Sequence, residues 1–362
     1  MCDMTGHDKA VRVGLSATLS KLDVVGKILC PRCECAVIDG SSSGNDVLDI
    51  SVKLLPPSPK IGDAKRGKRT DDIAVAKEII SGSINEKTLT FAGSRMQVEE
   101  IAATINDVCS HDNISSEAFP HHGSLSRETR ESLEKRLVNT DKPTMAIATV
   151  TLELGIDIGD IYRVFQVGTA NSVASLRQRI GRSGRRDGHK RAECIVTEAA
   201  APQDMEKNLV TTIAEIELMN AGWFEPPKSN RRDVSVLVSE ILSVLKQYGN
   251  AYEDDLYALL VERGAFTNVP RDMFGMIIAD MLEKEFLFSD PSSLLMIGDA
   301  GENEINDWRF YATFASEEAY TVRSGGKIIG EITPPSTSLQ KLAQGGTFML
   351  GGRYWQVIRF DS

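Results

Sequence analysis

The sequence predicts an α/β fold in which a parallel sheet is covered by helices, followed by a helical region and then a β-rich region. Three observations predict this order. Between residues 73 and 201, short apolar segments alternate with amphipathic segments of helical spacing. Residues 202–290 contain mainly amphipathic segments, and from Leu294 onward β-type segments alternate with glycine-rich turns. The alternation in the first region is typical of a parallel sheet with helices on both faces.

The segments of the first region can be placed one by one. Strands are expected at 88–92, 144–149, 162–167 and 193–197, and helices at 73–81, 98–108 and 128–137. Residues 117–119 lead into a loop that begins with His121-His122-Gly123. Earlier in the chain, a short strand is expected at 47–54. The apolar alternation within residues 11–19 predicts a strand that ends in a turn of small hydroxyl residues.

The segments after the sheet region predict two further domains. A helix is expected over 205–221, and three more follow at 234–248, 253–263 and 274–284, before the apolar Phe286-Leu287-Phe288. Three helices followed by an apolar strand is the order of a winged helix. Glycine-rich turns at 325–326 and 345–346 separate the later β-type segments, which is typical of a small twisted sheet or an open barrel.

Length and charge exclude several classes of protein. The chain has 362 residues, enough for two or three domains with cores of their own, and no apolar run approaches the ~20 residues that span a bilayer. The N-terminus carries no basic segment followed by an apolar one, so we expect a cytoplasmic protein that contacts no membrane. The net charge of -10 argues against binding nucleic acid through bulk charge, although it allows a local basic track.

The cysteines predict no metal site. In a cytosolic chain the six thiols are expected to stay reduced. Cys30 and Cys33 have the spacing of a zinc or redox motif, but no second ligand pair follows at a fixed spacing. We therefore expect incidental thiols.

The strongest chemical signal is Gln178-Arg-Ile-Gly-Arg-Ser-Gly-Arg185. Its arginines, Arg179, Arg182 and Arg185, recur every third residue, which predicts that they lie close together on one flank of a helix. Like charges at that spacing repel each other, so a solvated structural helix gains little from them. A polyphosphate facing them would remove the repulsion, because guanidinium groups bind phosphate oxygens in a bidentate way.

This stretch resembles motif VI of superfamily 2 helicases, whose final arginines reach the γ-phosphate of ATP held by the opposite domain. The resemblance assigns the catalytic arginine-finger role to Arg182 and Arg185, and a role in closing the ATP cleft to Gln178. The cofactor that it implies is ATP with Mg²⁺. An arginine finger in related phosphoryl-transfer systems is worth ~10³–10⁵ in rate, because it stabilises charge in the transition state.

The segment Ala148–Asp157 resembles motif V of the same helicases. The expected strand ends in hydroxyl residues, at the carboxyl edge where open α/β sheets bind their ligands. The resemblance assigns a contact with the nucleic-acid backbone to Thr149. It assigns contacts with the nucleotide ribose and the adjoining domain to Gly155 and Asp157.

Two earlier segments are expected to extend the nucleic-acid track. Thr90–Arg95 is similar to motif IV, a strand followed by a helix N-terminus, where free N–H groups and Ser94 bind a backbone phosphate; a plain helix cap by Ser94 is the alternative. His121-His122-Gly123 resembles the next strand-end loop. Adjacent histidines on an extended segment point to opposite faces. We therefore expect nucleic-acid contacts from Arg95, His122 and Gly123 rather than a metal site.

The segment Ser16-Ala17-Thr18 looks like motif III, which couples the ATP site to nucleic acid from the first helicase domain. In complete helicases the residues before it carry a phosphate-binding loop and an Asp-Glu metal motif, and neither occurs in this sequence. Gly62–Arg69 approaches the loop pattern, but Arg69 replaces the hydroxyl residue that holds Mg²⁺, so we reject it.

The order of all these segments resembles the C-terminal part of an Lhr-type (large helicase-related) superfamily 2 helicase that lacks most of the first RecA-like domain. Leu152–Asp157 is the form of motif V associated with this type, and Gly222–Pro226, Phe310–Phe314 and Gly351–Trp355 match its order. Trp223 and Trp355 are expected either to stack on bases of an exiting strand or to lie in a domain core. Residues 231–290 contain six Lys or Arg against eleven Asp or Glu, which favours a structural brace over a major-groove reader.

The resemblance implies an order of domains and a function. The expected divisions are 1–20 (remnant of a first RecA-like domain), 21–72 (linker and first strand), 73–201 (second RecA-like domain), 202–230 (helical linker), 231–290 (winged helix) and 291–362 (small β domain). The implied activity is that of an ATP-dependent helicase or translocase, inactive as this chain alone. Its expected partners are single-stranded DNA or RNA, duplex, and a separate chain carrying the N-terminal helicase half. The alternative is a non-catalytic nucleic-acid-binding or regulatory remnant.

Overall fold

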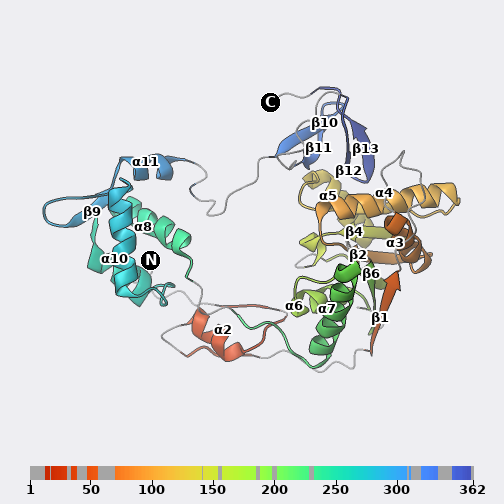
Figure 1. Ribbon diagram of the computed structural model, residues 1–362, viewed down its shortest axis with the longest axis horizontal. Helices are drawn as coiled ribbons and strands as arrows, with labels where there is room; N and C mark the ends of the chain where they lie inside the picture. Colours follow the sequence, from red (N-terminus) through yellow and green to blue (C-terminus); the bar gives the residue numbers. More distant parts are fainter. Residues whose placement is uncertain are drawn as a thin grey trace. The chain divides into compact units, whose positions relative to one another are not determined.

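The computed structural model of the chain forms two compact units (Figure 1). It describes residues 13–16, 18–30, 34–38, 47–55, 70–140, 142–153, 157–184, 188–197, 202–227, 232–307, 310, 319–332 and 345–359. The first unit, here called the sheet unit, comprises Leu15–Ser20, Ile38–Pro226 and Glu318–Ser362. The second, the helical unit, comprises Met1–Gly14, Lys21–Val37 and Pro227–Glu317. No helix in the described part of the chain is long and apolar enough to cross a membrane.

A parallel sheet is the centre of the sheet unit. Its strands, in spatial order, are β1 (Val47–Leu55), β6 (His189–Thr197), β5 (Arg163–Val167), β2 (Lys87–Phe91), β4 (Thr144–Ala148) and β3 (Ala118–His121). Every pairing between these neighbours is parallel. The predicted α/β fold with a parallel sheet is therefore confirmed, and the strand expected at 47–54 is an edge strand of this sheet.

Helices cover both faces of the sheet, because side chains alternate between the faces along each strand. In β4, Met145 and Ile147 pack with α3 (Thr70–Ser81) and α4 (Arg95–His111). Ala146 and Ala148 face α5 (Arg127–Asn139) on the other side. The same side of the sheet is covered farther along by α6 (Val173–Ile180) and α7 (Pro202–Asn220).

The strand expected within 11–19 is not found in the described residues of that range, since residues 13–16 and 18–20 have no strand structure. The buried Cys109 and Cys194 lie in the core, where burial raises the pKa of the Cys194 thiol to about 12. Cys33 lies outside the described residues, and the described ones contain no group of three or more metal-ligating side chains.

The helical unit has its own hydrophobic core. Its elements are α2 (Leu22–Leu29), α8 (Val234–Tyr248), β7 (Ala251–Tyr252), α9 (Glu253–Tyr257), a π-helical turn (Ala258–Glu262), α10 (Arg271–Glu283), β8 (Leu287–Ser289), β9 (Leu294–Ile297) and α11 (Asp299–Asn306). The strands form one antiparallel sheet in the order β7-β9-β8. Leu295 and Ile305 share a core with Leu237 and Phe274, so this core extends past residue 290, where we expected one domain to end and another to begin. The helix α11 was not predicted.

Two hairpins after residue 318 belong to the sheet unit rather than to the helical one. They are β10 (Tyr320–Ser324) with β11 (Lys327–Ile332), and β12 (Thr347–Leu350) with β13 (Arg353–Gln356). The backbone N–H of Glu331 donates to the Ser124 carbonyl at 2.6 Å. A Cβ on Gly330 would lie 2.4 Å from the same carbonyl oxygen, so this close approach requires glycine. The residues expected to form one small β domain thus lie in both units.

The turn of the second hairpin is held by a buried carboxylate on α4. Glu99 accepts hydrogen bonds from the backbone N–H groups of Gly351 (2.7 Å) and Gly352 (2.5 Å). Its side chain also contacts Nε2 of His122 at 2.8 Å. Glu99 and His122 are both buried. One side chain therefore fastens the hairpin to the sheet unit.

Substituting Glu99→Gln should lower the free energy of unfolding by about 1–3 kcal/mol, because the amide replaces one acceptor oxygen by a donor and so leaves one backbone N–H of the turn without an acceptor. Urea titration followed by circular dichroism measures the change. Glu128→Gln, on the exposed surface of α5, is the control and should unfold like the wild-type chain. Equal stability of the Glu99 variant and the control would contradict this role of Glu99.

Candidate nucleotide and nucleic-acid interface

The loops that follow β2, β3, β4 and β5 meet at the carboxyl edge of the sheet. Two backbone hydrogen bonds join them, from Ala92 N to the Ala148 carbonyl (3.0 Å) and from Thr149 N to the His121 carbonyl (3.2 Å). Parallel strands bring their carboxyl ends to one edge, which is where open α/β sheets bind ligands. The segments predicted to resemble motifs IV and V therefore lie in neighbouring loops. The predicted motif VI lies at the end of α6 and in the turn after it, which is joined to the segment after β4 by the hydrogen bond from Gly184 N to the Ile161 carbonyl (3.2 Å).

We had predicted that the three regularly spaced arginines lie on one helix, and this prediction was wrong. α6 ends at Ile180, and its C-cap is Gly181. Residues 181–184 form a turn in which Gly184 has φ +63°, and a Cβ there would lie 2.1 Å from the His189 carbonyl oxygen. Only glycine fits at position 184, and Arg182 lies in this turn, after the helix has ended. Arg185 lies outside the described residues.

Arg179 is a buried structural residue. Its Nε donates to Oε2 of Glu153 at 2.8 Å, and its Nη1 donates to Oε1 of Gln166 at 2.7 Å. The guanidinium also lies 5.0 Å from the centroid of the Phe91 ring. A charge at 3% exposure is costly unless it is paired, and Glu153 supplies the pairing carboxylate.

Arg182 is held by the backbone of Glu153. Its Nε (3.1 Å) and Nη2 (2.5 Å) both donate to the carbonyl oxygen of Glu153. The side chain of Glu153 in turn accepts from the Ser175 hydroxyl at 2.7 Å. Glu153 therefore joins the predicted motif V to the predicted motif VI. We had not predicted this role for Glu153. The signal in the sequence is that an acidic residue stands between two apolar ones, Leu152 and Leu154.

The N-terminal segment predicted to be motif III reaches this region through one contact. Nε2 of Gln178 donates to the hydroxyl of Thr18 at 2.6 Å. Ser16 is exposed and has no regular structure, and Ala17 lies outside the described residues. The two segments lie 160 positions apart in the chain. The side chain predicted to close the ATP cleft thus contacts the segment predicted to couple that cleft to nucleic acid.

The remaining predicted nucleotide-binding residues are Gly155 and Asp157. Gly155 lies outside the described residues. Asp157 is exposed, and its Oδ1 accepts from the backbone N–H of Gly159 at 3.1 Å. This is the short-range turn bond that an aspartate commonly makes in a loop.

The nucleic-acid residues predicted on the loops after β2 and β4 lie at the surface of the edge. Ser94 caps α4, since its hydroxyl accepts from Gln97 N at 3.2 Å. Both Ser94 and Arg95 are exposed, and Nη1 of Arg95 donates to the Ser124 hydroxyl at 2.9 Å. Thr149 is partly exposed. Arg95 therefore links the loop after β2 to the loop after β3.

The side chains of His121, the last residue of β3, and of His122 lie in the interior. His121 lies between the Thr151 hydroxyl, 2.8 Å from Nδ1, and the Glu134 carboxylate, 3.0 Å from Nε2. His122 is buried against Glu99. The side chain of His122 is therefore not at the surface where we had expected it, whereas the neighbouring Gly123 is exposed. A nucleic-acid contact at this loop would use backbone groups.

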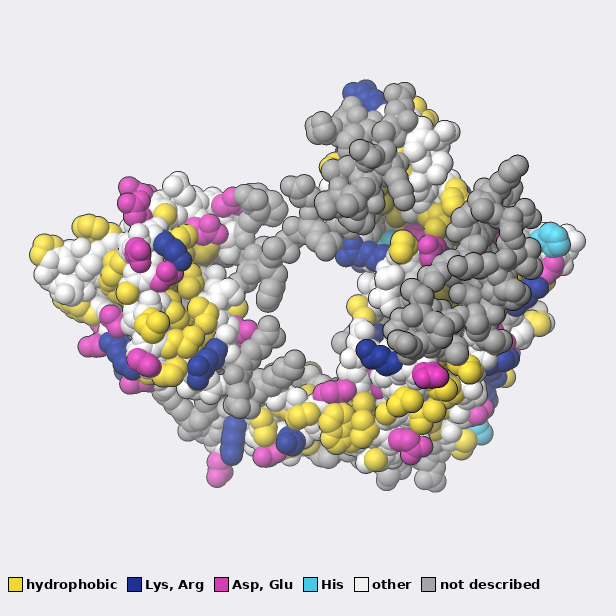
Figure 2. Space-filling view, viewed as in Figure 1, with side chains coloured by type: hydrophobic (Ala, Val, Ile, Leu, Met, Phe, Trp, Pro, Cys, Tyr) yellow, Lys and Arg dark blue, Asp and Glu magenta, His cyan; other side chains and the backbone are white. Residues whose placement is uncertain are grey.

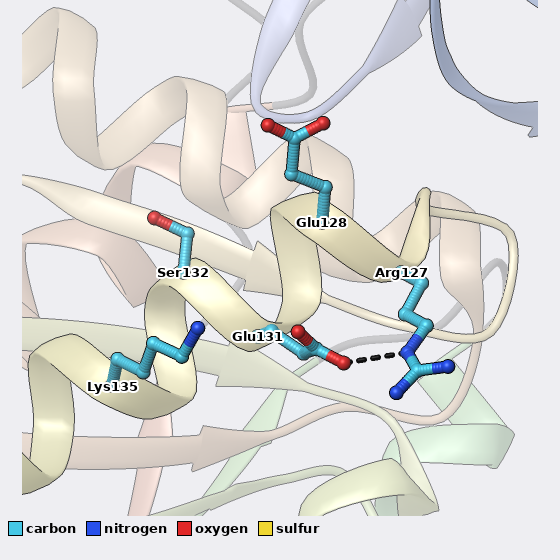
Figure 3. Close-up of a pocket in the computed structure, with 5 residues that line it drawn as sticks. All are labelled: Arg127, Glu128, Glu131, Ser132 and Lys135. Carbon is cyan, nitrogen blue, oxygen red and sulfur yellow. Dashed lines mark hydrogen bonds and ion pairs between the residues drawn. The ribbon is translucent and has the colours of Figure 1, made fainter.

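Charge is not gathered into one basic track on the face shown in Figure 2, where the visible Lys and Arg side chains of the described residues are scattered among acidic ones. A hollow of about 460 Å³ opens on α5, lined by Arg127, Glu128, Glu131, Ser132 and Lys135 (Figure 3). All five side chains come from one helix, and Arg127 pairs with Glu131 at 2.5 Å. The mixed charges on a single exposed helix select no ligand.

Part of the sheet unit is similar to a known family of domains. Residues 71–187 match the family described as the helicase conserved C-terminal domain. This match runs from α3 to the turn after α6 and includes β2, β3, β4 and β5 with the loops at their carboxyl ends, but not β1 or β6.

The similarity to particular proteins extends beyond that domain. The chain is 27% identical to the ATP-dependent helicase Lhr-Core of Methanothermobacter thermautotrophicus over 97% of its own length, and 26% identical to that of Methanocaldococcus jannaschii over 96%. It spans about 40% of the length of each of these relatives. The fold matches the helicase Lhr of Mycobacterium smegmatis, a structure bound to ssDNA and AMP-PNP, with a TM-score of 0.64, 21% identity, and coverage of 85% of this chain and 39% of that one. The predicted resemblance to the C-terminal part of Lhr-type helicases is confirmed.

The buried ring of His121 predicts a pH dependence of stability. Burial lowers its pKa below the ordinary 6.5, against the opposing effect of Glu134. Its contribution is then fully present above that ordinary value and is lost as the pH falls through the folded-state pKa. We expect the free energy of unfolding to fall between pH 7 and pH 5, and to fall less in His121→Gln.

Chemical denaturation at a series of pH values measures this difference. His111→Gln is the control, because His111 is an exposed histidine at the end of α4. If the His121 variant and the control lose stability in parallel as the pH falls, the assignment to His121 is wrong.

Proposed function

We propose that this chain is the C-terminal portion of an ATP-dependent nucleic-acid helicase or translocase. In this proposal it contributes arginine fingers to ATP hydrolysis and one side of a track for a single strand. The observation that carries the proposal is the junction at Glu153, which joins the motif V loop to Arg179 and Arg182 at the carboxyl edge of a helicase C-terminal domain.

The donors at this edge fit a nucleotide held from the opposite side. Arg182 directs Nε and Nη2 to the same side, where both donate to one carbonyl oxygen, and the same two N–H groups could instead bind two oxygens of a phosphate. A γ-phosphate would replace that carbonyl as the acceptor, and Arg185 would add a second guanidinium. Gln178, next to Thr18, would close the cleft. In this proposal a first RecA-like domain, in cis or on a separate chain, holds the ATP and its Mg²⁺.

The exposed groups of the neighbouring loops fit a strand backbone. Ser94, Arg95, Gly123 and Thr149 offer hydroxyl, guanidinium and peptide donors, which bind phosphates without reading base edges. The helical unit has the element order of a winged helix, with three helices before the β8–β9 hairpin, and we propose that it serves as a brace. Trp355 donates its ring N–H to the Leu350 carbonyl at 2.7 Å, which favours a packing role, whereas Trp223 is 45% exposed and remains a candidate for stacking on bases.

The chain alone should release no phosphate from ATP at saturating single-stranded DNA, because its sequence contains neither a phosphate-binding loop nor an Asp-Glu motif. Adding a first RecA-like domain taken from an Lhr-Core relative, fused or in trans, should give DNA-stimulated turnover. Arg182→Lys and Arg185→Lys should each reduce that turnover by at least about 10²-fold, because lysine keeps the charge but loses the bidentate fork.

Arg177→Lys, in the last turn of α6, is the matched control and should retain turnover. Full activity of both arginine variants would refute the motif VI assignment. Binding of single-stranded DNA without any turnover in the reconstituted protein would favour the alternative of a non-catalytic binding module.

Binding of the chain to nucleic acid should favour single strands, be independent of sequence, and weaken with salt, with a slope of log K on log salt of ~-0.7 per phosphate contact. Thr149→Ala should weaken binding by the same factor for oligonucleotides of different sequence. Fluorescence anisotropy at several salt concentrations measures both effects, with the exposed Ser132→Ala as control. Tight, sequence-specific duplex binding that persists at high salt would be incompatible with this proposal.

A further inference from the structure

The helix that carries Gln178 and Arg179 is too short to be stable by itself. α6 has eight residues, Val173–Ile180, and isolated helices shorter than ~12–15 residues are marginal in water. Its first-turn N–H groups have no partners within the helix. The position of α6 therefore depends on what binds its first turn and what packs on its side.

A carboxylate from far along the chain binds that first turn. Oε1 of Glu225 accepts from Val173 N at 2.7 Å, and Oε2 accepts from Ala174 N at 3.1 Å. The Ser172 hydroxyl accepts from Ser175 N at 3.0 Å, so three successive donors are satisfied. Burial raises the pKa of Glu225, but the backbone N–H groups outweigh it and the net shift is downward, which keeps the carboxylate charged.

Glu225 is itself held in place by the segment around it. Met219, with Ile216 and Phe224 beside it, packs in the same cluster as the apolar side of α6. Glu215 of α7 accepts from Ala170 N at 3.1 Å, just before α6 begins. Two prolines, Pro226 and Pro227, follow Glu225 and restrict its backbone to extended conformations. Residues 215–225, within the region expected to be a helical linker, thus hold α6 in place through packing and hydrogen bonds.

The other end of α6 leads directly into the predicted motif VI turn. Gly181 N donates to the Arg177 carbonyl at 2.9 Å, Arg182 N donates to the Arg179 carbonyl at 3.0 Å, and Ser183 N donates to the Ile180 carbonyl at 3.0 Å. Any shift or fraying of α6 is passed to this turn through these bonds. Glu225 binds the first turn of this eight-residue helix, and we therefore expect it to affect the residues at the other end.

We propose that Glu225 is a positioning residue for motif VI, which sets the placement of Gln178 and Arg182 by binding the first turn of α6. The structural part of this proposal, that Glu225 holds α6, concerns this chain alone. The catalytic part, that Glu225 affects ATP turnover, rests on the proposed helicase function. Glu225 contacts no substrate in this proposal and acts only through α6.

Hydrogen exchange on the chain alone tests the structural part. In Glu225→Gln, amides 173 and 174 should exchange about tenfold faster, the size expected for loss of a helix cap. The acceleration should extend to amides 181–183. Glu217→Gln, an exposed acid on α7, is the control and should leave all of these rates unchanged. Acceleration confined to 173 and 174, or none, would overturn the proposal without bearing on the helicase function.

Steady-state kinetics of the protein reconstituted with a first RecA-like domain test the catalytic part. Glu225→Gln should lower kcat about five- to tenfold while leaving the concentration of single-stranded DNA for half-maximal stimulation unchanged, because only motif VI is displaced. Glu225→Asp, which keeps the charge, should recover part of kcat. An unchanged kcat in an active reconstituted protein would overturn the catalytic part. A wild-type protein without turnover would refute the helicase proposal and leave the exchange result to decide the role of Glu225.

Discussion

The candidate site depends on one buried ion pair. The carboxylate of Glu153 accepts from Arg179 while its carbonyl accepts from Arg182, so a single residue of the loop after β4 fixes two arginines of the segment after β5. A guanidinium in the interior must be paired, and removing the carboxylate would leave an uncompensated buried charge. The pair therefore joins the loop after β4 to α6 through side chains, and the backbone hydrogen bond from Gly184 N to the Ile161 carbonyl (3.2 Å) joins the same two segments farther along.

The sheet was predictable because its signal is local. Strands buried on both faces are short and apolar, and helices between them are amphipathic, so periodicity is sufficient to place elements such as β4 and α4 within a few residues. The meeting of the loops at one edge follows from the parallel arrangement. The failure at residues 13–16 has the same origin, since a short apolar alternation does not reveal whether a neighbouring strand is available for pairing.

What the sequence did not reveal depends on partners distant in the chain. A spacing of three between arginines does not show where the helix ends, and α6 ends at Ile180, before Arg182. The adjacent histidines do point apart, as expected, but Glu99 and Glu134, both distant in sequence, bind them in the interior, so His122 is not at the surface. Glu99 and Glu225 bind backbone N–H groups of glycine, valine and alanine, which leave no compositional signal at all.

The chain leaves the sheet unit after Pro226 and returns to it at Glu318. This discontinuity constrains the order of events during synthesis. Glu99 emerges from the ribosome early, yet Gly351 and Gly352, which bind it, are translated only after the whole helical unit. At ~5–20 residues per second the delay is on the order of ten seconds. During that time the nascent sheet unit keeps a carboxylate in water that the finished protein buries.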